Sequence, residues 1–241
     1  MLFSSLVFLN LFLPLVLGLY YLVPRAGKNL LLLAASLVFY AWGEPSLVLL
    51  MLVSTAMNFG FGRWLQRTRG RPVSRWVLTL AIAANLSFLL FFKYAGFLVA
   101  GLNDVVAWWQ IEPFAVPSAA LPIGISFYTF QVMSYVVDVA RGEVDAENRF
   151  TNVALYIALF PQLIAGPIVR YRDVAAQIQD RRESFDLFAE GVQRFIAGLG
   201  KKMLIANSFA SVADAIFEIL DARLGAAVAW LGIICYTLQT L

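Results

Sequence analysis

Long apolar stretches separated by short polar loops constrain this chain more than any other feature. Only 14% of the 241 residues are charged and 61% are hydrophobic, whereas soluble domains carry about 25% charged residues. The apolar excess is too large for one buried core, so we expect most of these residues to face lipid. The stretches lie at 3–23, 30–42, 47–61, 77–100, 121–140, 153–169, 203–220 and 224–241.

The lengths of these stretches predict an all-α fold that crosses the membrane several times, as a single transmembrane domain over 1–241. A spanning helix needs about 20 residues, and about 17 at the least, so 3–23, 77–100 and 121–140 are the clearest spans. The stretches at 30–42 and 47–61 form either two short spans or a hairpin that enters and leaves by one face. Residues 1–23 lack a basic leading region and a cleavage site, so we expect a first membrane helix rather than a signal peptide.

The charged loops predict an orientation. Loop 24–29 is basic, whereas the charged residues of 43–46 and 101–120 are all acidic. Basic loops face the cytoplasm, so the N-terminus is expected to face outward. The same placement accounts for the net charge of +3 without a nucleic-acid partner. The most basic loop is 62–75, which has no acidic residue and carries Arg63, Arg67, Arg69, Arg71 and Arg75.

The stretch at 150–169 differs from the others because two prolines and a glycine interrupt it. Proline removes a helical hydrogen bond and clashes with the preceding turn, so no continuous helix is expected here. Basic residues flank both ends, which predicts that both ends lie on the cytoplasmic side. Interrupted backbone is tolerated at membrane depth only inside protein or beside water, so we predict a re-entrant segment that lines a central cavity. The candidate cavity-lining residues are Pro161, Gln162, Gly166, Pro167, Arg170 and Tyr171; a structural kink between packed helices is the alternative.

Residues 184–200 are expected to form an amphipathic helix at the inner membrane interface. Phe188, Val192 and Phe195 recur at helical spacing, whereas Asp186 and Arg194 lie elsewhere on the helix.

Three charges inside apolar stretches are functional candidates, because such charges are costly in lipid. Lys93 either serves function or extends its amine to the outer interface. Asp138 is three residues from Arg141, so a local ion pair is its simplest alternative. Asp214 marks either a wet cavity or a stretch that is not fully embedded. The single cysteine, Cys235, is expected to be a small buried hydrophobe.

Several catalytic classes lack their usual residues. The chain contains no histidine, which is the commonest general base near neutral pH. We find no metal-ligand cluster, phosphate-binding glycine loop or nucleophile–base pair in the sequence, and therefore assign no catalytic residue and no metal site.

Specific motifs, kept in order along the chain, resemble the membrane-bound O-acyltransferase family and most closely its alginate O-acetyltransferase branch. The longest are LPIGISFYTFQ at 121–131 and LFPQLIAGPIVRY at 159–171. Shorter ones are MLFSS at 1–5, FYAWGEP at 39–45, FKY at 92–94 and GKK at 200–202.

The resemblance implies a shell of helices around a central cavity closed by a re-entrant segment, in a bacterial inner membrane. It implies transfer of acetyl groups to hydroxyls of an exported polysaccharide on the far side. The donor, for which acetyl-CoA is a candidate, would approach from the cytoplasm as a substrate, and no covalently bound cofactor is implied. Membrane lipid and periplasmic acetylation proteins are the implied partners.

The family's catalytic histidine lies in a C-terminal half to which nothing here corresponds. The chain therefore resembles the N-terminal half of the family and is expected to be inactive alone. A non-catalytic membrane scaffold or assembly subunit is the main alternative. A transporter with a broken helix at its midplane is a third, against which the lack of inverted repeats argues.

Overall fold

The structure is a computed structural model that describes residues 3–43, 45–109, 112–116, 124–163, 168–219 and 225–240. All regular elements in these ranges are helices, which confirms the predicted all-α class. The helices form two compact units, one of Pro14–Arg181 and one of Leu2–Leu13 together with Arg182–Leu241.

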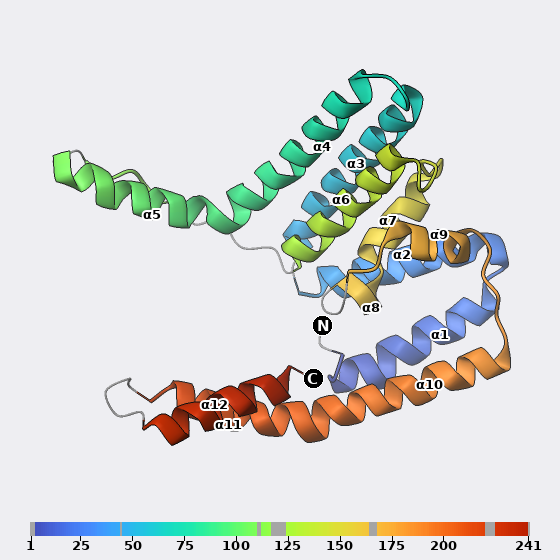
Figure 1. Cartoon of the computed structure of the whole chain (residues 1–241). Coiled ribbons are helices and arrows are strands. Elements are labelled where there is room, and N and C mark those ends of the chain that lie inside the picture. Colours follow the sequence, from blue (N-terminus) through green and yellow to red (C-terminus); the bar gives the residue numbers. More distant parts are fainter. Residues whose placement is uncertain are drawn as a thin grey trace. The chain divides into compact units, whose positions relative to one another are not determined.

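Helix α6 (Ile125–Arg141) is the centre of the first unit. It packs against α3 (Val48–Thr68), α4 (Val73–Leu89), α7 (Phe150–Ala158) and α9 (Tyr171–Gln179). Figure 1 shows α3, α4 and α6 running side by side. The buried residues that α6 contributes to this core are Ile125, Tyr128, Thr129, Gln131, Val132, Tyr135, Val136, Asp138 and Val139.

A glycine permits the close approach of α3 and α6. A Cβ atom at Gly62 would lie 2.7 Å from the hydroxyl oxygen of Tyr135. Real Cβ atoms do not approach another atom so closely, so a side chain here would displace Tyr135 from the core. Gly60, two residues earlier, faces open space.

A buried pair of amides joins α3 to α4. Asn58 donates to Oδ1 of Asn85 at 2.9 Å, and Asn85 donates back to Oδ1 of Asn58 at 2.8 Å. Each amide also donates to the carbonyl four residues earlier in its own helix. Such satisfied amide pairs join helices in a setting where an unpaired polar group would be costly.

One long helix leaves this bundle. It runs from Val73 to Trp109 over 37 residues, through α4, a π-helical turn at Leu90–Tyr94 and α5 (Ala95–Val106). Figure 1 shows α5 turning away from the direction of α4 after that π turn. The bend agrees with the general link between π turns and helix bends. Lys93 lies in this turn. Helix α5 has no buried residue.

Two helices, Val48–Thr68 and Val73–Trp109, are long and apolar enough to cross a membrane. The stretch 47–61, expected to be short, belongs to the first of these, because the helix continues through its basic end to Thr68. Large apolar side chains are exposed along both, including Leu49, Leu80 and Phe97 at 68%, 51% and 75%. Their exposure, together with the helix lengths, is typical of a membrane protein.

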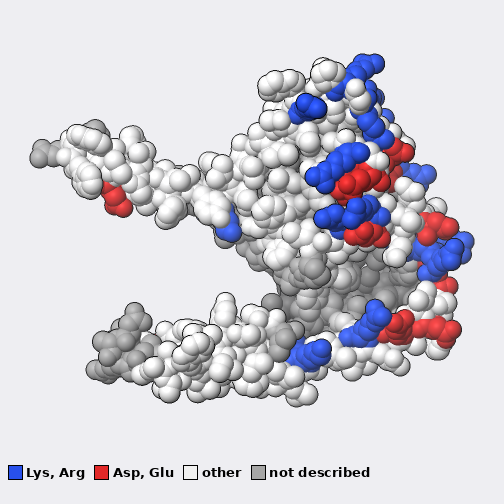
Figure 2. Space-filling model, viewed as in Figure 1, with Lys and Arg blue, Asp and Glu red and all other residues white. Residues whose placement is uncertain are grey.

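The basic loops of the first unit meet. Arg69 binds Asp145 across 3.0 Å and donates to the carbonyls of Val139 and Val144. Arg172, in the first turn of α9, pairs with Glu143 at 2.6 Å. Figure 2 shows most of the visible charged residues of this unit along one border, with uncharged atoms over most of the visible surface elsewhere. The loops predicted to share a membrane face therefore lie together.

The second unit consists mainly of α10 (Phe185–Gly200), α11 (Asn207–Phe217) and α12 (Ala226–Gln239). The backbone N–H of Leu187 donates to the Ser184 hydroxyl, which caps α10 at the boundary predicted from the sequence. Helices α11 and α12 pack closely at Gly232, where a Cβ atom would lie 2.8 Å from Ile216. Cys235 is buried at 3% exposure, as predicted.

Candidate functional site

The interrupted segment begins with α7, which ends at Ala158. Leu159 has non-helical backbone angles, with φ −53° and ψ 112°, and the short helix α8 (Phe160–Leu163) follows. Two predicted cavity-lining residues, Gly166 and Pro167, lie outside the described residues. Pro161 is the second residue of α8, in a first turn where the missing backbone N–H of proline removes no helical hydrogen bond.

Two glutamines complete the end of α7. The carbonyl of Tyr156 accepts a hydrogen bond from Nε2 of Gln131 at 2.9 Å and another from Nε2 of Gln162 at 2.5 Å. The last carbonyls of a helix lack partners within the helix, so these amides replace the bonds that the break removes. Gln162, predicted as a cavity-lining residue, thus has at least this structural task.

The two ends of the interrupted segment lie together. The hydroxyl of Tyr156 donates to the carbonyl of Val169 at 2.7 Å. The hydroxyl of Tyr171, just after the segment, donates to Oε2 of Glu147, just before it, at 2.9 Å. The Tyr171 ring packs edge-on against both Tyr156 and Tyr135. The chain therefore returns to its starting point within 24 residues.

Glu147 is the centre of the polar network at this meeting point. Its carboxylate accepts from the backbone N–H groups of Asn148 and Arg149, at 2.8 and 3.0 Å. It also accepts from Tyr171 and, at 3.4 Å, from Nε2 of Gln179 in the last turn of α9. One side chain thus links the entry to α7 with both ends of α9.

Opposing effects act on the pKa of Glu147. Burial raises the pKa, but the hydrogen bonds from Arg149, Asn152, Tyr171 and Gln179 lower it, and the net result lies below the usual value. The pKa of Tyr171 is raised, first by burial and then by the charge of Glu147. Near neutral pH the pair therefore consists of a carboxylate and a neutral phenol.

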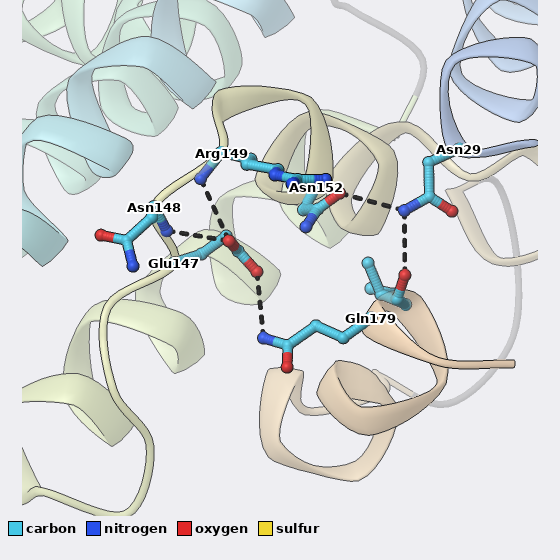
Figure 3. A pocket seen from close by; sticks show the side chains of 7 residues that line it. Asn29, Glu147, Asn148, Arg149, Asn152 and Gln179 are labelled. Carbon is cyan, nitrogen blue, oxygen red and sulfur yellow. Dashed lines mark hydrogen bonds between the residues drawn. The ribbon is translucent and has the colours of Figure 1, made fainter. Parts of the chain in front are cut away.

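A cavity of about 320 Å³ opens beside Glu147 (Figure 3). Asn29, from α2 (Arg25–Ala41), donates to Oδ1 of Asn152 at 3.0 Å and to the carbonyl of Ile178 at 2.9 Å. Arg181 in turn donates to Oδ1 of Asn29. We call this cavity the Glu147 pocket; its lining residues are Asn29, Glu147, Asn148, Arg149, Asn152, Ile178 and Gln179.

Asp138 does not form the predicted local ion pair. The guanidinium of Arg141 lies 3.8 Å from Glu143 instead, because the chain turns at Gly142, whose φ is 78°. Asp138 is only 3% exposed, and within the described part of the chain its Oδ2 has no hydrogen-bond partner. Asp138 therefore remains a functional candidate.

The other predicted residues are dispersed. Pro161 and Arg170 are exposed near the ends of the interruption. Lys93 is exposed with its amine 5.4 Å from the centre of the Tyr94 ring, and Asp214 is exposed on α11 in the second unit. Only Gln162 and Tyr171 of the described cavity candidates join the buried network.

Sequence reasoning missed Glu147, Gln131 and Asn152, which organise this network. Gln131 and Asn152 offered a signal, because each is an amide within an otherwise apolar helix. Glu147 lies in a polar loop where an acid is unremarkable, and its burial becomes visible only when α7 and α9 are placed around it. The network supplies support and hydrogen-bond donors rather than a free base, since the Glu147 carboxylate is occupied.

Comparison with known proteins gives similarity over 99% of the chain. The protein described as "Probable alginate O-acetylase AlgI" from Azotobacter vinelandii is 46% identical over 241 residues, which are 48% of its length. Its namesake from Pseudomonas aeruginosa is 44% identical, with 46% of its length covered. The Helicobacter pylori peptidoglycan O-acetyltransferase is 30% identical, with 50% covered.

The chain spans about half the length of these curated relatives. No family model and no solved structure matches it. The identity of 41–46% to the alginate O-acetylases extends over 99% of the chain. The chain is thus homologous to alginate O-acetylases, which confirms the resemblance to the alginate branch of the membrane-bound O-acyltransferases.

Proposed function

We propose that this chain is the membrane-embedded part of a polysaccharide O-acetyltransferase. The observation that carries the proposal is similarity along 99% of the chain to two kinds of relatives. Their printed names concern alginate and peptidoglycan, so the shared chemistry is acetyl transfer to a sugar polymer. Because relatives named for different acceptors share this part of the chain, we assign it to binding of the donor and to the membrane rather than to recognition of one acceptor.

In this proposal the segment 150–169 is re-entrant and lines the central cavity. The hydrogen bond from Tyr171 to Glu147 supports this, because it joins the residues just after and just before the segment. Helix α7 has nine residues, or roughly 14 Å at about 1.5 Å per residue, about half of an apolar layer of roughly 30 Å. A helix of that length that breaks and returns reaches the middle of the bilayer without crossing it.

The chemistry requires more than the described network offers. A sugar hydroxyl attacks the acetyl carbonyl, the bond to the donor's leaving group breaks, and the hydroxyl proton passes to a base and then to that group. A positioned base contributes about 10²–10⁴-fold, and this chain contains no histidine. We place the base in a further part of the enzyme, the donor at the cytoplasmic face and the exported polymer on the other side, with periplasmic proteins assisting.

Acetylation by the purified chain tests this division. The chain alone, given acetyl-CoA and a mannuronate polymer, should give only background acetylation, whereas co-expression with the half of an alginate O-acetylase that the chain does not match should give turnover. The measured quantity is radiolabelled acetate bound to polymer, compared with a no-protein control. Donor-dependent transfer by the chain alone would show that the chemistry resides here.

Cysteine labelling tests the re-entrant segment separately. Single cysteines at Arg149 and at Asp180, in a Cys235→Ala background, should both react with an impermeant reagent applied from the cytoplasmic side. Labelling of the two cysteines from opposite sides would mean that 150–169 crosses the membrane.

Reporter fusions test the orientation of the chain. Fusions after Arg75 and after Glu112 should report cytoplasm and exterior, respectively.

A further inference from the structure

A second cavity lies on the same border of the first unit, where the end of α3 meets the loop before α7. It has a volume of about 180 Å³, which is enough for a phosphate group with part of its substituent. We call it the Arg63–Arg67 cleft; its lining residues are Arg63, Gln66, Arg67, Ala146 and Asn148.

Two guanidinium groups in this cleft lack a carboxylate partner. Arg63 and Arg67 are four residues apart on α3, so their side chains lie on one face, where like charges repel. No described acidic residue forms an ion pair with either; the carboxylate of Asp145 binds Arg69 instead. The guanidinium of Arg63 lies over the Phe59 ring, 5.8 Å from the ring centre, and this contact does not neutralise its charge.

Amide groups complete the lining. Oε1 of Gln66 accepts a hydrogen bond from the backbone N–H of Ala146 at 2.5 Å, which fixes the loop against α3. The Asn148 side chain makes no hydrogen bond within the described ranges, and Asn148 also lines the Glu147 pocket. A ligand seated at the two arginines could therefore extend into a second cavity rich in amide groups.

Orientation in a membrane would account for all five arginines of loop 62–75 in the same way. The structure, however, gives these arginines different surroundings. Arg69 is committed to Asp145 and to two backbone carbonyls. Arg71 and Arg75 do not line the cleft, whereas Arg63, which is half-buried, and Arg67, which is exposed, both do. Only Arg63 and Arg67 combine a shared cavity with unpaired charge, an arrangement that orientation does not require.

We propose that the Arg63–Arg67 cleft binds a phosphate group. Guanidinium groups match phosphate oxygens with paired hydrogen bonds, and the amide of Asn148 can supply a further donor. The phosphate belongs either to a soluble nucleotide-like ligand that continues into the Glu147 pocket or to a phospholipid headgroup. The proposal does not depend on acyl transfer, so its test is independent of the acetylation assay.

Binding to the full chain in maltoside micelles, which contain no phosphate, tests the cleft with two probes. The first is 3′,5′-adenosine diphosphate, followed by titration calorimetry. The second is phosphatidylglycerol added to the micelles, followed by native mass spectrometry. The double variant Arg63→Gln/Arg67→Gln should bind one of these probes at least about tenfold more weakly than the wild type, the size expected when charge-assisted bonds are lost. The affected probe identifies the source of the phosphate.

The matched control is Arg71→Gln/Arg75→Gln, which removes the same charge from the same loop outside the cleft. It should bind both probes within about twofold of the wild type, since exposed charges at this distance contribute only screened attraction. The variant Arg63→Lys/Arg67→Lys keeps the charge and provides a second measurement if the glutamine variant does not fold. It should bind more weakly than the wild type because lysine cannot form the paired bonds. Equal binding by wild type and cleft variants, or an equal loss in the control, would overturn the proposal.

Discussion

Helices α7 and α5 are both built mainly from apolar residues, yet they have opposite environments. Seven of the nine residues of α7 are buried, Asn152 through Ala158, whereas none of the twelve residues of α5 is. Helix α7 packs against α2, α3, α6 and α9. Helix α5 packs mainly against its own continuations, the π turn before it and the short 3₁₀ turn after it.

The difference shows that apolar composition alone does not tell which partner a helix needs. Protein side chains surround α7 on all sides and fix its rotation, so its polar residues can serve as internal hydrogen-bonding groups. Helix α5 needs an apolar solvent or another surface around it. Substitutions of the same type in the two helices should therefore have very different effects on stability.

Truncation of a large apolar side chain should give the greatest contrast. Ile157→Ala in α7, where the side chain is 0% exposed, should reduce the free energy of unfolding by about 2–5 kcal/mol through the cavity it leaves. Leu98→Ala in α5, at 55% exposure, should change it by no more than about 0.5 kcal/mol. Reversible unfolding in mixed micelles measures both; similar losses would show that α5 is packed in the folded protein.

The charge of Glu147, three residues before α7, should make stability pH-dependent. The folded-state pKa of Glu147 is lowered, so its contribution is present above the unfolded pKa and is lost as pH falls through the folded value. Glu147→Gln should cost about 1.5–3 kcal/mol at pH 7, the size of hydrogen bonds to a charged group, and less in acid. Asp104→Asn, at an exposed position in α5, should change the free energy of unfolding at pH 7 by no more than about 0.5 kcal/mol. Parallel pH profiles of the melting temperature for wild type and Glu147→Gln would contradict the assignment.

Removal of one hydroxyl from each region should give the smallest contrast. Tyr156→Phe loses the bond to the carbonyl of Val169 at 2.7 Å and should destabilise the protein by about 1 kcal/mol. Tyr94→Phe, at the start of α5 and 39% exposed, should have no measurable effect on thermal unfolding. Faster hydrogen exchange confined to the backbone around Val169 in the first variant would place the loss at the predicted bond.

The sequence predicted α7, its break and the helical class because these features depend on local signals. Hydrophobic length indicates helices, and Pro161 indicates an interruption. Helix ends were less predictable: α3 continues to Thr68 because arginine and glutamine are compatible with a helix even though they end an apolar stretch.

The polar network was largely unpredictable, since it depends on residues far apart in the chain. Asn29 meets Asn152 across 123 positions, and no local pattern encodes that contact. For Asp138, a local pattern suggested a contact that the fold does not form. Its distance of three residues from Arg141 predicted an ion pair, but the side chain of Asp138 points into the core while Arg141 is exposed.

The helix from Val73 to Trp109 has a consequence for the bilayer around it. Its 37 residues extend roughly 55 Å at about 1.5 Å per residue, nearly twice the roughly 30 Å of hydrocarbon. A straight rod of that length would fit only at a tilt of about 57°, beyond the roughly 0–40° found for membrane helices. The π turn at Leu90–Tyr94 ends the first part close to one bilayer thickness and redirects the rest. The bend thereby relieves a hydrophobic mismatch that would otherwise thicken the surrounding lipid.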